Sequence, residues 1–186
     1  MSEDLSKRPP LPEIEVFRLR RRHLNDVIEI EADVFARPWS TALFLQELSK
    51  PNRSYFVAEY DGEVIGYGGL MFTSENDAHA LNVAVTPAFH RRQVGTRLLC
   101  VLMMDAIAKG VDTIYLEFRV SNVAGYSIYP KFGFEIVDMR KGYYFETGED
   151  GIVMALKNAQ TPEYRARLKG IAESVGGVKG DEVPLI

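Results

Sequence analysis

The residues of this chain that could most readily do chemistry form a short basic loop followed by a glycine. Residues 90–92 read His-Arg-Arg, and Gly95 lies three residues further on. Pro87 ends an apolar, β-branched run before the loop, and residues 98–107 after it have the periodicity of a helix with one buried face. Free amides at a helix N-terminus, with arginines beside them, bind anions. We therefore expect this segment to bind a phosphate or a pyrophosphate.

Two common phosphate-binding motifs are missing from this segment. A P-loop needs GxxxxGKS or GxxxxGKT, and a dinucleotide-binding turn needs GxGxxG at the start of a helix. Gly95 is the only glycine in residues 87–107, so neither pattern is present. The residues alone leave two interpretations open. The loop binds a different phosphorylated ligand, or it is an ordinary basic loop before a core helix.

The loop resembles the acetyl-CoA signature of the GNAT superfamily of N-acetyltransferases, Q/R-x-x-G-x-G/A. Residues 90–95 read HRRQVG and depart from it twice, since His90 replaces Gln or Arg and Gln93 replaces the first glycine. Residues 116–134 resemble a second, longer GNAT pattern, L-x-V-x-x-x-N-x-x-A-x-x-x-Y-x-x-x-G-F. Because the second pattern is long and position-specific, it decides between the two interpretations in favour of the coenzyme site.

Three segments look most like the ribosomal-protein-alanine N-acetyltransferases of this superfamily. They are LEFRVSN at 116–122, RKGYY at 140–144 and GEDGIVMAL at 148–156. The resemblance covers residues 14–157 and is weakest before residue 52. It implies an α+β fold, in which a central mixed, mostly antiparallel twisted sheet is flanked by helices.

The resemblance also implies an activity, with acetyl-CoA as the co-substrate. The expected acceptor is a protein N-terminal α-amine, in the first place the N-terminal alanine of a small-subunit ribosomal protein. Two alternatives stay open. The acceptor is another amine, such as a lysine, another N-terminus or a small amine, or the protein is a catalytically reduced CoA-binding partner module. The departures at His90 and Gln93 motivate the second alternative.

Acyl transfer from a thioester to an amine needs a base for the amine and an acid for the departing thiolate. A free α-amine has a pKa of about 8, against about 10.4 for lysine, so a modest base suffices for an N-terminus. Glu117 lies between the apolar residues Leu116 and Phe118, a weakly solvated setting that suits a base. The resemblance implies that Glu117 is the proton acceptor and that Tyr129 protonates the thiolate.

The remaining site residues are expected to bind the coenzyme. Asn122 can cap a helix, and the resemblance implies that it also hydrogen-bonds the pantetheine arm. The strand before the loop would contribute backbone groups only. The expected cofactor-binding residues are Val83, Ala84, Val85, Arg91, Arg92, Gln93, Val94, Gly95, Thr96 and Asn122.

The acceptor side is harder to predict. The family places its acceptor groove near five residues of this chain, which are Phe35, Arg37, Trp39, Tyr143 and Tyr144. Trp39 is equally well explained as a core anchor, so both interpretations remain open. Cys100 lies in the middle of an apolar helical run, which indicates buried packing. His23 and His79 have no metal-ligand spacing and no evident partners, and we predict no metal.

Composition sets broad limits on function. The 186 residues suit one domain, and the net charge of −4 argues against nucleic-acid binding by bulk charge. The single cysteine excludes an internal disulfide and predicts a reducing cytoplasm. No apolar run approaches the length of a membrane span, so we expect no membrane partner.

We expect three parts along the chain: a flexible arm over 1–13, the acetyltransferase domain over 14–157 and an extension over 158–186, whose plainest interpretation is a loosely held appendage. Hydrophobic periodicity and turn residues predict the elements of the domain. The expected strands are 14–19, 55–60, 63–72, 82–85, 111–120, 134–139 and 152–156, with a long turn between the last two. The expected helices are 24–35, 41–48, 98–107, a short one after Asn122, and 163–175.

Overall fold

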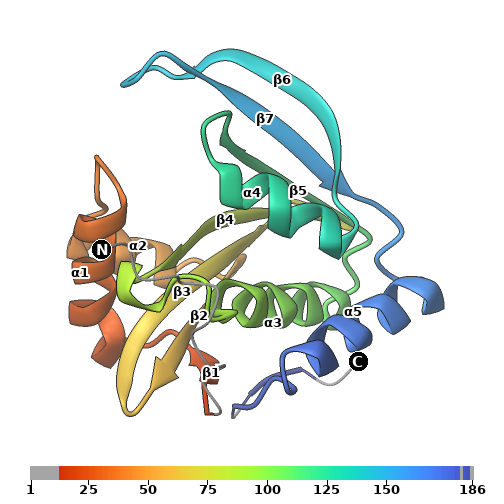
Figure 1. Cartoon of the computed structure of the whole chain (residues 1–186), viewed down its shortest axis with the longest axis horizontal. Helices are drawn as coiled ribbons and strands as arrows, with labels where there is room; N and C mark the ends of the chain where they lie inside the picture. The colour runs from red at the N-terminus through yellow and green to blue at the C-terminus, as the bar shows by residue number, and fades with distance from the viewer. Residues whose placement is uncertain (1–12, 181, 185–186) are drawn as a thin grey trace, which may run out of the picture.

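One seven-stranded sheet organises the part of the chain that the computed structural model describes, residues 13–180 and 182–184 (Figure 1). The strand order is β1-β2-β3-β4-β5-β7-β6, and only the β4–β5 pair is parallel. This arrangement confirms the predicted α+β class with a mixed, mostly antiparallel sheet. The strands are β1 (Glu15–Arg18), β2 (Arg53–Tyr60), β3 (Glu63–Phe72), β4 (Asp77–Val85), β5 (Thr113–Arg119), β6 (Glu135–Tyr144) and β7 (Glu149–Leu156).

Helices cover both faces of the sheet. They are α1 (Leu24–Val34), α2 (Thr41–Leu48), α3 (Val94–Ala108), α4 (Val123–Ile128) and α5 (Pro162–Ser174). On one face α3 buries Leu98 and Leu102 against the sheet, and on the other α2 buries Phe44. Successive residues of β2 point to opposite faces, so Phe56 joins the first core and Val57 the second. The sheet therefore lies between two separate hydrophobic cores, one on each face.

Local sequence signals explain several of the element boundaries. Asp61 and Gly62 both have positive φ, 54° and 80°, in the tight turn between β2 and β3, as their predicted hairpin requires. The Ser40 side chain accepts a hydrogen bond from the Leu43 amide at 3.3 Å and begins α2. In the same way the Asn122 side chain accepts from the Gly125 amide at 3.0 Å and begins α4.

The sheet opens between β4 and β5. Their ladder has three residue pairs and ends where His79 meets Tyr115. Beyond that point, among the described residues, β5 pairs with β7 alone and the rest of β4 pairs with β3 alone. Within this part of the chain, one edge of the second half of β4 therefore has no neighbouring strand. The β6–β7 hairpin continues beyond β5 and reaches away from the rest of the sheet (Figure 1).

Three boundary predictions are corrected. The strand predicted at 82–85 begins at Asp77. The helix predicted at 98–107 begins at Val94, because residues 95–97 (Gly-Thr-Arg) interrupt the apolar periodicity. The turn between β6 and β7 is short, residues 145–148, since both strands extend further than their apolar segments. Residues 1–12 of the predicted arm lie outside the described residues.

The prediction that the C-terminal extension is loosely held is wrong. Helix α5 lies against α3 and buries Tyr164, Leu168 and Ala172. After α5, the Val16 amide donates to the Lys179 carbonyl at 2.8 Å, which attaches the chain to the edge of β1. The extension is thus held at two places. The apolar face of α5 packs on α3, and the Lys179 backbone bonds to the edge of β1. No helix within the described part of the chain has both the length and the apolar character needed to cross a membrane.

Candidate active site

The loop between β4 and α3 is held in an uncommon backbone conformation. Arg91 and Gln93 both lie in the left-handed region, with φ of 63° and 64°, and Gln93 is the N-cap of α3. The Gln93 side chain makes no capping hydrogen bond, so the first amides of the helix stay available to a ligand. Non-glycine residues adopt this conformation at a cost of about 1–2 kcal/mol each. Such backbone strain is often found in functional loops.

His90 and Arg92 have different roles in this loop. The His90 Nε2 lies 2.9 Å from the Val85 carbonyl, so the ring fastens the loop back onto the end of β4. The Arg92 guanidinium lies over the Phe89 ring at 5.9 Å, and its buried Nε has no hydrogen-bond partner within residues 13–180 and 182–184. A buried guanidinium nitrogen without a partner suits an anionic ligand.

The end of β4, the start of α3 and helix α4 meet at the opening in the sheet. A Cβ placed on Gly95 would lie 3.7 Å from Ile128 of α4 and 3.9 Å from Val85 of β4, both ordinary contacts. The Val83 and Val85 side chains pack against the core beside α3, and Ala84 is buried on the other face. These three residues can therefore offer only backbone groups to a ligand, as their sequence predicts.

Tyr129 lies at the end of α4 among aromatic rings. Its ring centroid is 5.4 Å from that of Phe118 and 5.9 Å from that of Phe134. Burial raises the pKa of Tyr129 to about 12, so the phenol stays protonated at neutral pH. A proton donor has to be in this state.

Glu117 is buried beside two basic side chains. Only 7% of its side chain is exposed, and its Oε1 accepts a hydrogen bond from Arg140 Nη1 at 2.8 Å. Its Oε2 lies 2.5 Å from His79 Nε2. The expectation that His79 has no partner is therefore wrong, and so is the same expectation for His23, whose Nε2 lies 3.3 Å from a Glu59 oxygen. His79 and Tyr115 are opposite each other in the β4–β5 ladder, and Glu117 is two residues beyond Tyr115 on the same face.

Tyr144 of β6 lies beside the end of the strand that carries Glu117, with its ring centre 4.0 Å from the Arg119 guanidinium carbon. Burial is the main cause that raises the pKa of the Tyr144 phenol to about 12, and the Arg119 charge acts in the opposite direction. Tyr143 and Tyr144 also pack edge to face, with ring centroids 5.1 Å apart. The fold thus brings residues of β5, of the turn after α4 and of β6 close together, although residues 117 and 144 are 27 positions apart in the chain.

Two of the predicted acceptor-groove residues, Trp39 and Arg37, differ in their surroundings. Trp39 packs against Phe44, with ring centroids 5.3 Å apart, and its amide donates to the Glu31 carboxylate at 2.7 Å. These contacts favour the interpretation of Trp39 as a core anchor. The guanidinium of Arg37 instead lies 5.3 Å from the centre of the exposed Phe145 ring. Arg37 therefore connects the α1–α2 loop with the β6–β7 turn.

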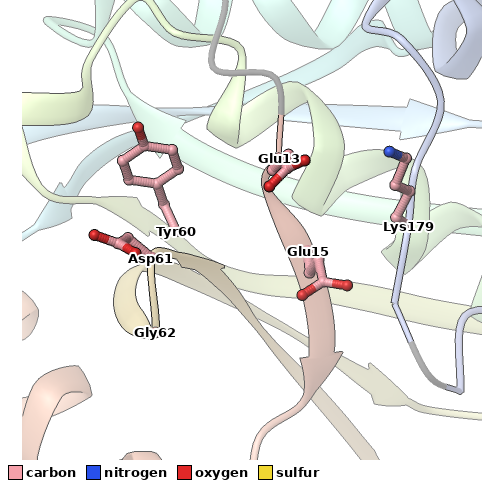
Figure 2. Close-up of a pocket in the computed structure, with 6 residues that line it drawn as sticks. All are labelled: Glu13, Glu15, Tyr60, Asp61, Gly62 and Lys179. Carbon is pink, nitrogen blue, oxygen red and sulfur yellow. The ribbon is translucent and has the colours of Figure 1, made fainter.

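Two other candidate features lie apart from this site. Cys100 is fully buried, and burial raises the pKa of its thiol to about 12, which makes it an inert packing residue. Figure 2 shows a hollow beside β1 that shares no residue with the predicted site. It is lined by Glu13, Glu15, Tyr60, Asp61, Gly62 and Lys179. No group of three or more His, Cys, Asp and Glu side chains that could hold a metal ion occurs in the described ranges.

Comparison with known proteins identifies the family. The model of the acetyltransferase (GNAT) family matches residues 24–134. The chain belongs to this family. It is 33% identical over 148 residues to the N-alpha-acetyltransferase RimI of Mycobacterium tuberculosis, an alignment that covers 76% of this chain and 90% of the relative.

Two comparisons with Escherichia coli proteins agree with this result. The chain is 31% identical over 140 residues to a ribosomal protein bS18-alanine N-acetyltransferase, covering 74% of this chain and 93% of the relative. The crystal structure of a ribosomal-protein-S18-alanine N-acetyltransferase superposes with a TM-score of 0.73 at 28% identity, covering 81% of this chain and 97% of that one. The resemblance predicted from the sequence is thus confirmed at the level of family and fold.

Proposed function

We propose that this protein transfers the acetyl group of acetyl-CoA to a protein N-terminal α-amine, with the N-terminal alanine of ribosomal protein bS18 as the first candidate. The observation that carries the proposal is the buried Glu117 carboxylate, held by His79 and Arg140 beside the opening between β4 and β5. The relatives' names supply the acceptor.

The donor side of the site fits a coenzyme with phosphates and a long polar arm. The α3 amides after Gln93, together with Arg91 and Arg92, would hold the pyrophosphate. The open edge of β4 at Val83–Val85 would pair with the amide groups of the pantetheine arm, and Asn122 would lie beside that arm. Acetyl-CoA, when bound there, supplies an activated acyl group. The loop's departures from the family signature are consistent with this role, because His90 fastens the loop and Gln93 contributes its backbone.

Glu117 would accept the proton that the acceptor ammonium loses, either directly or through one water. Its two oxygens already have fixed neighbours in His79 and Arg140, so the carboxylate is oriented before the acceptor arrives. An α-amine with a pKa of about 8 is roughly one-tenth free at pH 7, so the base has a modest task. Tyr129, which stays protonated, would deliver a proton to the sulfur as the thiolate leaves.

A panel of peptides tests this proposal. The peptides are a bS18 N-terminal peptide beginning with alanine, the same peptide with a blocked α-amine, and a blocked peptide that offers only a lysine. We expect acetyl-CoA-dependent product from the first and little from the other two, measured by thiol release and product mass. Preference for the lysine peptide would overturn the N-terminal assignment. Binding of acetyl-CoA without turnover of any amine would favour the CoA-binding module.

A further inference from the structure

Arg119, at the end of β5, joins the strand that carries Glu117 to the turn between β6 and β7. Its Nη2 forms an ion pair with Glu146, and its Nη1 donates to Thr147 Oγ1 at 2.8 Å. The same nitrogen lies 3.4 Å from a Glu149 oxygen. Its guanidinium carbon also lies 4.0 Å from the centre of the Tyr144 ring. One side chain thus contacts the turn, the first residue of β7 and an aromatic residue at the end of β6.

A second contact ties the turn to the chain after β5. The other carboxylate oxygen of Glu149 accepts a hydrogen bond from the Ser121 amide at 3.3 Å. Ser121 directly precedes Asn122, the cap of α4 and a predicted coenzyme ligand. The turn over residues 145–148 is therefore fixed relative to β5, which carries Glu117, and to α4, which Tyr129 directly follows.

Within the described residues, the outer strand of this hairpin is held by its pairing with β7 and by a few side-chain contacts, among them that of Arg140 with Glu117. Nine of the ten residues of β6 are exposed, and β6 is the edge strand of the sheet. Its pairing with β7 shifts register between Arg140 and Tyr144, just before the turn. A strand that buries so little apolar surface has low local stability. The backbone of Tyr144 pairs with Glu149 at the turn, and the contact with Arg119 additionally fixes the position of its ring.

We propose that Arg119 is a positioning residue for the acceptor, acting through Tyr144 and the β6–β7 turn. This inference rests on the proposed function, because it assigns the hairpin to binding of the acceptor's N-terminal segment. A planar guanidinium can stack on Tyr144 and bind Glu146 and Thr147 at the same time. An ammonium group has the charge but not this geometry. Arg119→Lys should therefore weaken binding of the acceptor, although the charge is conserved.

Steady-state kinetics on Arg119→Met and Arg119→Lys test the proposal. We expect the KM for the alanine peptide to rise by about tenfold or more in both, since Arg119→Met removes the guanidinium and Arg119→Lys keeps its charge but not its planar geometry. The affinity for acetyl-CoA should stay within about twofold, because the donor loop is untouched. Hydrogen exchange at the amides of residues 145–149 should be faster in both variants.

Two further variants guard against a general loss of folding. Lys141→Met removes an exposed ion pair with Asp150 on the same hairpin and should change neither the KM nor the exchange. Glu146→Gln removes the negative charge that pairs with Arg119 in the turn and should raise the KM in the same direction but by less. An unchanged KM in active Arg119→Met, or full activity in Arg119→Lys, would overturn the role of Arg119 alone. Failure of the wild type to acetylate any α-amine would overturn the proposed function and the acceptor role together.

Discussion

The loop before α3 and the β6–β7 hairpin lie on opposite sides of the proposed reaction and differ in how they are held. In the loop, the groups proposed to bind a ligand are mainly backbone amides, and left-handed residues at Arg91 and Gln93 present them. On the hairpin, the groups are side chains, and other side chains such as Arg119 hold them in place. Backbone geometry can be kept by many residue types, whereas a contact between two side chains requires both partners.

This difference explains how the chain departs from its family signature on the donor side. Gln93 stands where the signature has glycine, but it still adopts the backbone conformation that glycine favours. His90 bonds to the Val85 carbonyl and so preserves the shape of the loop by another route. We therefore expect substitutions of the proposed reacting groups, Glu117 and Tyr129, to change turnover the most. Substitutions of Gln93 should change it the least.

Tyr129→Phe should have the largest effect. Removing a positioned acid lowers kcat by roughly 10²–10⁴-fold, while the ring stays packed between Phe118 and Phe134. The dissociation constant of acetyl-CoA, measured by calorimetry, should change little. Because the Tyr129 pKa is about 12, its phenol remains protonated below that pH and causes no fall in kcat between pH 7 and 10. Unchanged turnover would assign the acid role to another group or to water.

Gly95→Val should have an intermediate effect that is confined to the donor side. The family signature allows alanine at this position, and an added Cβ meets Ile128 and Val85 only at ordinary contact distances, so Gly95→Ala is the matched control. If a ligand approaches the backbone closely at this point, the branched valine should weaken acetyl-CoA binding by about tenfold, whereas alanine should not. The KM for the acceptor peptide should stay the same. Normal acetyl-CoA affinity in Gly95→Val would show that Gly95 does not face the coenzyme.

Gln93→Gly should have the smallest effect on binding. We expect the dissociation constant of acetyl-CoA to stay within a few fold, about 1 kcal/mol or less, because only the backbone of Gln93 is used. The free energy of unfolding should not fall, since glycine relieves the strain at φ 64° and offsets its greater freedom when unfolded. A large gain in affinity would instead show that the Gln93 side chain obstructs the site.

The sequence predicted the elements whose signals are local. The turn at Asp61–Gly62, the caps at Ser40 and Asn122, and the apolar strands follow from residue type and spacing, and the structure contains them. The contact between His79 and Glu117 could not be predicted in this way. It depends on the register of a parallel pair joined through α3, and no local residue pattern encodes that register.

The outer strand and the C-terminal extension were predicted less well for a related reason. Strand β6 is exposed on both faces and so lacks the alternation that marks a half-buried strand, which made its predicted length too short. Helix α5 has a narrow apolar stripe, and its partner α3 is more than fifty residues away in the chain. The periodicity of the sequence predicted the helix, but it did not predict that the helix packs against α3.

The dependence of turnover on pH in Glu117→Gln tests the central claim most directly. For the wild type, kcat/KM should rise with pH and level off above about pH 8, which is the pKa of an α-amine. In Glu117→Gln the loss should be greatest at neutral pH, where most of the amine is protonated, and should shrink toward pH 10, where the amine is already free. His79 and Arg140 would keep the substituted side chain in place, so acetyl-CoA affinity serves as the control. A variant as active as the wild type at every pH would remove Glu117 from the reaction.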